Sequence, residues 1–223
     1  MSGAEPAAGS RCCLVVMLKA PERSKRRLAA EIGPRATEAA RHLYQCVLED
    51  LAEWPHEVCF APASPADPCP ADAAGLVVVQ PPGNLGERIE HVDRELRRRG
   101  VGRPLFIGTD CIELDGGYLR RAASALDAHD VVLGPARDGG VVLMGARTPW
   151  PALGGLPWST AALGAALHAR CSSAGLSVAL LAERGDVDTR ADLAAARRRL
   201  AADPRPARRA FARWLAEQTD LEP

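Results

Sequence analysis

The sequence lacks the cysteine and histidine patterns that build disulfide frameworks and metal clusters. Its seven cysteines are an odd number, and none is separated from the next by the two residues typical of a zinc site or redox pair. The five histidines, at positions 42, 56, 91, 129 and 168, likewise show no ligand spacing. We therefore expect reduced thiols packed as small apolar groups, and no histidine-based metal site.

Long apolar runs and a net charge are also missing. No apolar run approaches the roughly 18 residues that cross a bilayer, and the first residues do not combine a charged start with a long apolar stretch. The 28 basic and 28 acidic residues cancel, which argues against a general attraction to nucleic acid. These absences predict a cytoplasmic protein that binds neither membrane nor nucleic acid.

A glycine-rich phosphate loop is absent as well. The segment after the first apolar run, "KAPERSKRR" at 19–27, has neither the glycines of a Walker loop nor those of a dinucleotide fingerprint. It carries five cations and one anion in nine residues. This basic loop is either a phosphate-binding segment or a solvated charged loop.

Seven apolar segments alternate with helical patterns. The segments rich in β-branched residues predict buried strands at 12–18, 57–62, 75–80, 104–109, 130–135, 141–146 and 177–181. Apolar residues repeating every three or four positions predict helices at 34–54, 85–100, 117–128, 160–174, 190–200 and 206–218. This alternation indicates an α/β fold with a doubly wound, mostly parallel sheet.

The connection "ARDGG" between the strands at 130–135 and 141–146 is too short for a helical crossover. We therefore expect this pair to be antiparallel and the sheet to be mixed. The length suits one full α/β domain. We place it at 11–201, with a C-terminal helical extension at 202–223 packed on it.

Acidic residues follow two of the predicted strands. Asp110 ends the strand at 104–109, and ligands of doubly wound sheets bind beyond the carboxyl ends of the strands. Asp186 and Asp188 are two residues apart, so both side chains of an extended segment project to one side. Such carboxylates suit Mg²⁺ or Mn²⁺ bound to phosphates. Alternatively, Asp110 caps the helix beginning near Asp115, and Asp188 caps the helix that follows it.

Three further positions have both a functional and a plain structural interpretation. Asp138 lies in the "ARDGG" connection and either faces a ligand or only forms a hairpin turn. Trp158, in "LPWST", could cover a sugar or base, while Ser159 could simply cap a helix. Asn84, in "GNLGERI", is a candidate helix cap. The arginines at 196–214 are typical of a solvated helix face.

Taken in order, "KAP", "KRRLA", "GNLGERI", "GTDCIEL", "DVVLGPARDGGVVLMG", "PWST" and "DVDTRADL" resemble a bacterial family described as glycosyltransferases with the GT-A fold, often found at selenium or arsenosugar loci. The resemblance covers about residues 13–193. The family is similar to the nucleotidyltransferases that make molybdenum cofactor and the guanylylated lactate of the deazaflavin cofactor.

The resemblance implies roles for particular residues. Asp110 would be the metal aspartate, Asp186 or Asp188 the second metal arm, and Lys19, Lys25 and Arg27 the nucleotide phosphate contacts. We accordingly expect a transferase that uses Mg²⁺ or Mn²⁺ and passes a glycosyl group from a nucleoside diphosphate sugar to a small-molecule acceptor, with Asp138 on the acceptor side. The alternatives are a nucleotidyltransferase that uses a nucleoside triphosphate and releases pyrophosphate, and a catalytically silent protein that binds nucleotide or a partner.

Overall fold

The computed structural model describes residues 11–67, 69–70 and 76–218. Their centre is a mixed sheet of seven strands in the order β3-β2-β1-β4-β6-β5-β7. The strands are β1 (Arg11–Leu18), β2 (Glu57–Pro62), β3 (Leu76–Val77), β4 (Val101–Ile107), β5 (Val131–Pro135), β6 (Val141–Ala146) and β7 (Val178–Leu180). The α-helices are α1 (Arg26–Ile32), α2 (Arg35–Ala52), α3 (Leu85–Arg98), α4 (Gly116–Ala128), α5 (Leu163–Ser173), α6 (Arg190–Leu200) and α7 (Pro206–Glu217).

The strand directions confirm the predicted mixed sheet. β1 runs parallel to both β2 and β4, and β7 runs parallel to β5. β6 is antiparallel to β4 and to β5, as the short connection between β5 and β6 predicted. The carboxyl ends of β1 and β4 therefore lie side by side at one edge of the sheet.

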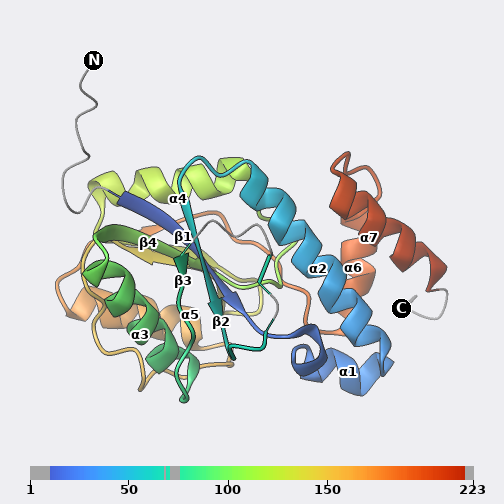
Figure 1. Ribbon diagram of the computed structural model, residues 1–223, viewed down its shortest axis with the longest axis horizontal. Helices are drawn as coiled ribbons and strands as arrows, with labels where there is room; N and C mark the ends of the chain where they lie inside the picture. Colours follow the sequence, from blue (N-terminus) through green and yellow to red (C-terminus); the bar gives the residue numbers. More distant parts are fainter. Residues whose placement is uncertain (1–10, 68, 71–75, 219–223) are drawn as a thin grey trace.

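Alternating side chains of the strands build a core on each face of the sheet. In β1, Leu14 and Val16 pack with side chains of α2 and α4, whereas Cys13 and Val15 pack with those of α3 and α5. Figure 1 shows α4 on one side of the strands and α3 on the other. Strands buried on both faces give the continuous apolar runs seen in the sequence.

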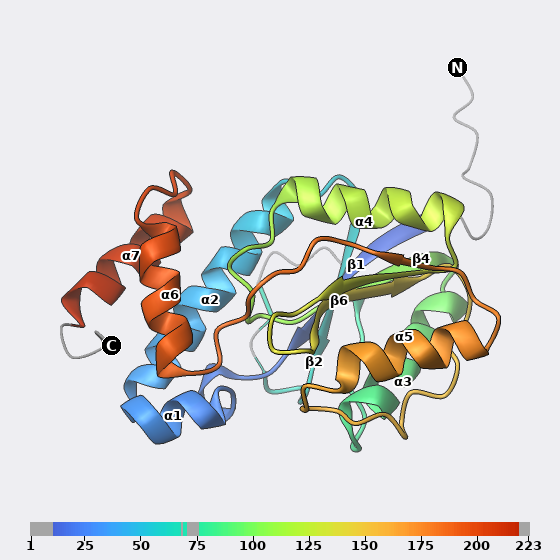
Figure 2. The ribbon, with the colours of Figure 1, turned by 180° about the vertical axis from the view of Figure 1, so that it is seen from behind.

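A third apolar cluster joins α1, α2, α6 and α7 beside the sheet. Leu28, Leu43, Leu193 and Phe211 are among its buried members. Figure 2 shows α6 and α7 next to α2 at one end of the molecule. The C-terminal helices α6 and α7 therefore share an apolar core with α1 and α2, the helices that follow β1.

Three sequence predictions fail locally. The strand predicted at 75–80 is confined to Leu76–Val77 among the described residues, at the edge of the sheet. Helix α5 begins at Leu163 and not at 160, because Ser159 adopts a left-handed conformation (φ 63°) and Ala162 takes the cap position. The side chain of Arg208 is 0% exposed, so a fully solvated arginine face is also wrong.

None of the helices that the described residues form combines the length and apolar character needed to cross a membrane.

Candidate functional site

Asp110 lies just beyond β4 and does not cap the next helix. Asp115 takes that role, since its Oδ1 accepts a hydrogen bond from the backbone N–H of Tyr118 at 2.6 Å. The capping alternative for Asp110 is therefore wrong. Its side chain is 43% exposed at the carboxyl edge of the sheet, where ligands of doubly wound folds bind.

The segment that carries Asp186 and Asp188 runs beside Asp110. The backbone N–H of Val187 donates to the backbone oxygen of Asp110 at 2.9 Å. The Val187 side chain is buried in the apolar cluster of α1, α6 and α7, so its two neighbours project the other way. Thr189, not Asp188, caps α6 by accepting from the N–H of Asp192. Both carboxylates are thus left without a capping role.

The ammonium of Lys25 lies between two of these carboxylates. Its Nζ is 2.8 Å from Asp110 Oδ1 and 2.8 Å from Asp188 Oδ1, and it also donates to the backbone oxygen of Val187. These contacts engage all three of its N–H groups. The Lys25 side chain is 2% exposed. Although burial alone would lower the pKa of Lys25, the charges of Asp110 and Asp188 hold that pKa above its ordinary value.

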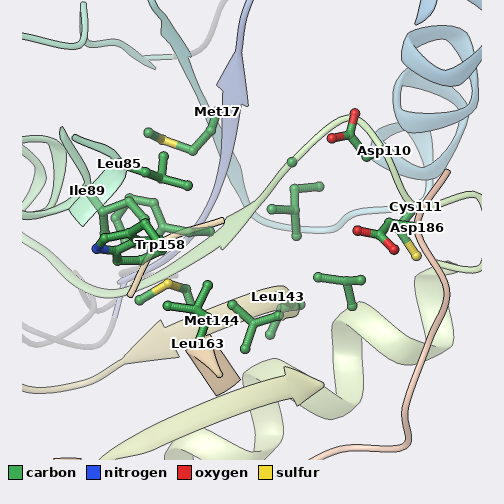
Figure 3. A pocket seen from close by; sticks show the side chains of 15 residues that line it. Met17, Leu85, Ile89, Asp110, Cys111, Leu143, Met144, Trp158, Leu163 and Asp186 are labelled. Atoms are coloured by element: carbon green, nitrogen blue, oxygen red, sulfur yellow. The ribbon is translucent and has the colours of Figure 1, made fainter. Parts of the chain in front are cut away.

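Negative charge also converges on Asp186. Burial, followed by the negative charges of Asp138, Asp188 and Asp110, raises the pKa of this carboxyl to about 6. Three aspartates, each from a different segment or loop, therefore act electrostatically on Asp186. Figure 3 shows Asp110 and Asp186 at the same end of the adjoining cavity.

This pKa predicts a pH-dependent stability in metal-free protein. Between an unfolded pKa near 3.8 and a folded pKa of about 6, only folded Asp186 binds a proton, so its ionisation costs stability as the pH rises through this range. We expect Asp186→Asn to raise the free energy of unfolding at pH ~7 by about 1 to 2 kcal/mol, allowing for partial solvation, and to have no such effect at pH ~4. Urea denaturation of both proteins in EDTA measures this. A difference that stays the same at the two pH values would contradict it.

Asp138 forms the predicted turn and also borders the acidic site. Its Oδ1 accepts a hydrogen bond from the backbone N–H of Gly140 at 2.9 Å, which is the contact of an ordinary turn. It also lines a cavity of about 320 Å³ together with Asp186, Asp188 and Arg27. A turn-forming carboxylate is thus held at the rim of the acidic site.

A basic cluster lies beyond the carboxyl end of β1. The Lys19 side chain is largely exposed. Its partial burial lowers its pKa, and the positive charges of Arg26, Arg88 and Arg23 lower this pKa further. Arg23 is paired with Asp67, and Arg88 donates to the backbone oxygen of Gly83 at 2.8 Å. In the described part of the chain, no hydrogen bond or ion pair is formed by the side chain of Lys19 or of Arg26.

Sequence reasoning missed Arg26 and Arg88 as candidate site residues. Arg26 stood in the basic loop and gave a signal, whereas Arg88 belongs to the first turn of α3, far from that loop in sequence. Arg27, which the resemblance selected, lines the 320 Å³ cavity, and its guanidinium donates to the backbone oxygen of Ser159 at 3.3 Å. It therefore connects α1 to the loop that carries Trp158.

A second cavity, of about 170 Å³, opens between the acidic site and α3. Its walls are mainly apolar, with Met17, Leu85 and Trp158 at one end and Asp110 and Asp186 at the other (Figure 3). The indole N–H of Trp158 donates to the backbone oxygen of Leu153 at 2.9 Å, which fixes the ring. The site thus has an apolar compartment next to a charged one.

The Cys111 side chain packs in the core and is not a candidate nucleophile. Its thiol is buried, and this burial, followed by the charge of Asp186, raises its pKa to about 12. A thiol with such a pKa stays protonated and unreactive near neutral pH. It belongs to the apolar cluster between the sheet and α4, as expected of a reduced thiol packed as a small apolar group.

The carboxylates fit only a particular kind of metal site. Among residues 11–67, 69–70 and 76–218, no group of three or more His, Cys, Asp or Glu side chains is arranged to hold a metal ion. Mg²⁺, however, usually binds one or two carboxylates and takes its other ligands from water and substrate phosphates. Asp110 and Asp188, which both contact the ammonium of Lys25, supply such a pair of carboxylates.

The fold is that of the nucleotide-diphospho-sugar transferases. A crystal structure from Desulfovibrio desulfuricans G20, described as a "putative nucleotide-diphospho-sugar transferase", is 26% identical, with a TM-score of 0.81 over 94% of this chain and 96% of that one. The chain belongs to a family of uncharacterized proteins conserved in bacteria, DUF2064, which it matches over residues 45–160.

More distant structures share the fold alone. An Rv0371c homolog from Mycobacterium sp. strain JC1 is 15% identical, with a TM-score of 0.53 over 96% of this chain and 99% of that one. Rv0371c from Mycobacterium tuberculosis H37Rv is 16% identical, with a TM-score of 0.52 over 82% of this chain and 94% of that one. No protein with a curated description matches the chain.

Proposed function

We propose that this protein is a metal-dependent glycosyltransferase that uses a nucleoside diphosphate sugar and a small-molecule acceptor. One observation carries the proposal. Asp110 and Asp188 are 78 residues apart in sequence, yet both contact the ammonium of Lys25 at the carboxyl edge of the sheet. The description of the Desulfovibrio protein supports the same class of substrate. Manganese, present in a crystal structure of Rv0371c, suits a carboxylate pair equally well.

Asp110 and Asp188 are the proposed ligands of Mg²⁺ or Mn²⁺. The bound ion would neutralise the negative charge that develops on the departing diphosphate. Of the two acidic residues left open by the sequence, Asp188 is favoured because it already shares a cation with Asp110. Lys25 is a proposed phosphate contact only after its ammonium leaves the carboxylates, since its three N–H groups are engaged.

The basic cluster of Lys19, Arg26 and Arg88 is the proposed phosphate-binding surface. The side chains of Lys19 and Arg26 form no hydrogen bond or ion pair within the described residues, so their charges are available to an anion. On the opposite side, Asp138 and Asp186 are proposed to face the acceptor. A carboxyl with a pKa of about 6 suits the removal of a proton from an acceptor hydroxyl near neutral pH.

The test replaces the carboxylate at the end of β4. For the wild-type protein, we expect Mn²⁺ with UDP or GDP to raise the melting temperature by about 5 to 10 °C at ~100 times the dissociation constant. Asp110→Asn should abolish this shift, because one of two metal ligands loses its charge. Asp127→Asn is the matched control. Asp127 is an exposed carboxylate of α4 that pairs with Arg103 of β4, away from the site.

An undiminished shift in Asp110→Asn would remove Asp110 from the metal site. The basic cluster also suits a triphosphate, so a nucleotidyltransferase is the second candidate. Release of pyrophosphate from nucleoside triphosphates would identify it. A wild-type protein that no nucleotide stabilises, with either metal, would instead favour the catalytically silent alternative.

A further inference from the structure

We propose that the 170 Å³ cavity binds a compact apolar group of the acceptor, such as a phenyl ring or a short branched alkyl chain. The inference rests on the proposed function and adds the chemical class of the acceptor: an alcohol whose hydroxyl is attached to an apolar body. The cavity lies between β4, β6, α3 and α5, next to Asp110 and Asp186.

The walls of the cavity offer almost nothing to a polar ligand. They include Ile89, Phe106, Met144, Trp158 and Leu163, and the indole N–H of Trp158 is already bonded to Leu153. Among the side chains that line the cavity, only those of Asp110 and Asp186 are charged, and Figure 3 shows both at one end. An occupant would therefore be apolar over most of its length and polar at that end.

The size of the cavity selects a ring or a short branched chain. An apolar cavity of ~150 Å³ in another protein stays dry and accepts benzene, and the cavity here is about 170 Å³. A sugar would not suit it, because hydroxyl groups placed against apolar walls would lose their hydrogen bonds to water without gaining others. The walls thus favour an apolar acceptor over a carbohydrate.

The apolar wall is preformed and partly uncovered. Trp158 packs so closely on α3 that a Cβ at Gly86 would lie 2.5 Å from its Nε1. Leu85, which also lines the cavity, is 41% exposed, although a large aliphatic side chain gains free energy when it is covered. An acceptor in the cavity would cover Leu85 and place its hydroxyl at the charged end, beside Asp110 and Asp186.

Gly108 allows the cavity to be filled without disturbing the backbone. It lines the cavity and lies two residues after Phe106, so a side chain there projects from the same face. A Cβ built on Gly108 meets no atom within 4 Å, and its φ is not positive. Gly155, which also has open space and no positive φ but does not line the cavity, provides the matched control.

The experiment measures binding of benzyl alcohol by ligand-observed NMR and titration calorimetry. We expect the wild-type protein and Gly155→Val to bind it with a dissociation constant of about 1 to 10 mM, and glycerol not to bind. Gly108→Val should weaken binding of benzyl alcohol at least ~10-fold, because its branched side chain occupies the space. Gly108→Ala, a smaller change, should weaken it less.

The outcomes separate this inference from the proposed function. No binding of benzyl alcohol to the wild-type protein, or equal binding by Gly108→Val and Gly155→Val, would overturn the inference. If the Mn²⁺ and nucleotide shift persists in that case, the glycosyltransferase proposal stands without it. If benzyl alcohol binds as expected but no nucleotide binds, the apolar site stands and the proposed transfer reaction does not.

Discussion

Arg208→Met is expected to lower the free energy of unfolding by about 3 to 5 kcal/mol, the usual cost of removing one partner from a buried ion pair. Arg208 extends from α7 and donates to Glu49 and Asp50 of α2, each at 2.8 Å. It also donates to the backbone oxygens of Ile112 at 3.1 Å and Leu114 at 2.8 Å. Methionine fills similar space but leaves the 3% exposed carboxylate of Asp50 with only Arg205 as a charged partner.

Urea denaturation measures this loss, and Arg209→Met is its matched control. Arg209 is the next residue of α7 and is exposed, so the same substitution there should change stability by less than ~0.5 kcal/mol. Adding Asp50→Leu to Arg208→Met should recover part of the loss, because it removes the unpaired buried charge. Equal stability of the Arg208→Met and Arg209→Met proteins would show that the buried guanidinium does not stabilise the fold.

The contacts of Arg208 also connect the C-terminal helices to the proposed site. Ile112 and Leu114 belong to the segment between Asp110 and α4, and both of their carbonyl groups accept hydrogen bonds from the same guanidinium. Arg205 donates to Leu114 as well, at 3.2 Å. The loop that follows Asp110 is therefore held from one side by a helix almost 100 residues further along the chain.

Much of the sheet could be predicted because its signals are local. Continuous apolar runs identified β1, β4, β5 and β6, and the five-residue connection between the last two implied their antiparallel pairing. The capping role of Asn84 could also be predicted from the sequence, because Glu87 three residues later completes a capping box. These features depend on residues that lie close together in sequence.

The buried charges could not be predicted, because their partners come from distant segments. Arg208 lies in a run of arginines that is typical of an exposed helix face. Nothing nearby in sequence indicates that two acids and three backbone carbonyl groups would accept hydrogen bonds from it. Similarly, the basic loop gave Lys25 no distinction from Arg26, although one is buried and the other exposed. Spacing showed that Asp186 and Asp188 share a side, but not that Asp138 would raise the pKa of Asp186.

Lys25→Met is expected to destabilise the metal-free protein and to strengthen its binding of Mn²⁺. Without the ammonium, Asp110 and Asp188 face each other with no cation between them. We expect this to lower the free energy of unfolding by about 1 to 3 kcal/mol. Because both side chains are partly solvated, the loss should lie in the lower part of this range. The same loss removes a competitor for the two carboxylates. We therefore expect Mn²⁺ affinity to rise ~10-fold, equivalent to about 1.4 kcal/mol.

Urea denaturation in EDTA and Mn²⁺ titration followed by electron paramagnetic resonance measure the two effects. Lys19→Met is the matched control, since it removes an equal charge from the basic cluster, where no carboxylate contact is lost. The residue at position 25 has a left-handed backbone (φ 52°). Lys25→Met replaces one non-glycine side chain with another there, so backbone strain should be the same in the variant and in the wild-type protein. If Lys25→Met leaves Mn²⁺ affinity unchanged while it weakens nucleotide binding, the ammonium acts on phosphate alone and does not occupy the cation position.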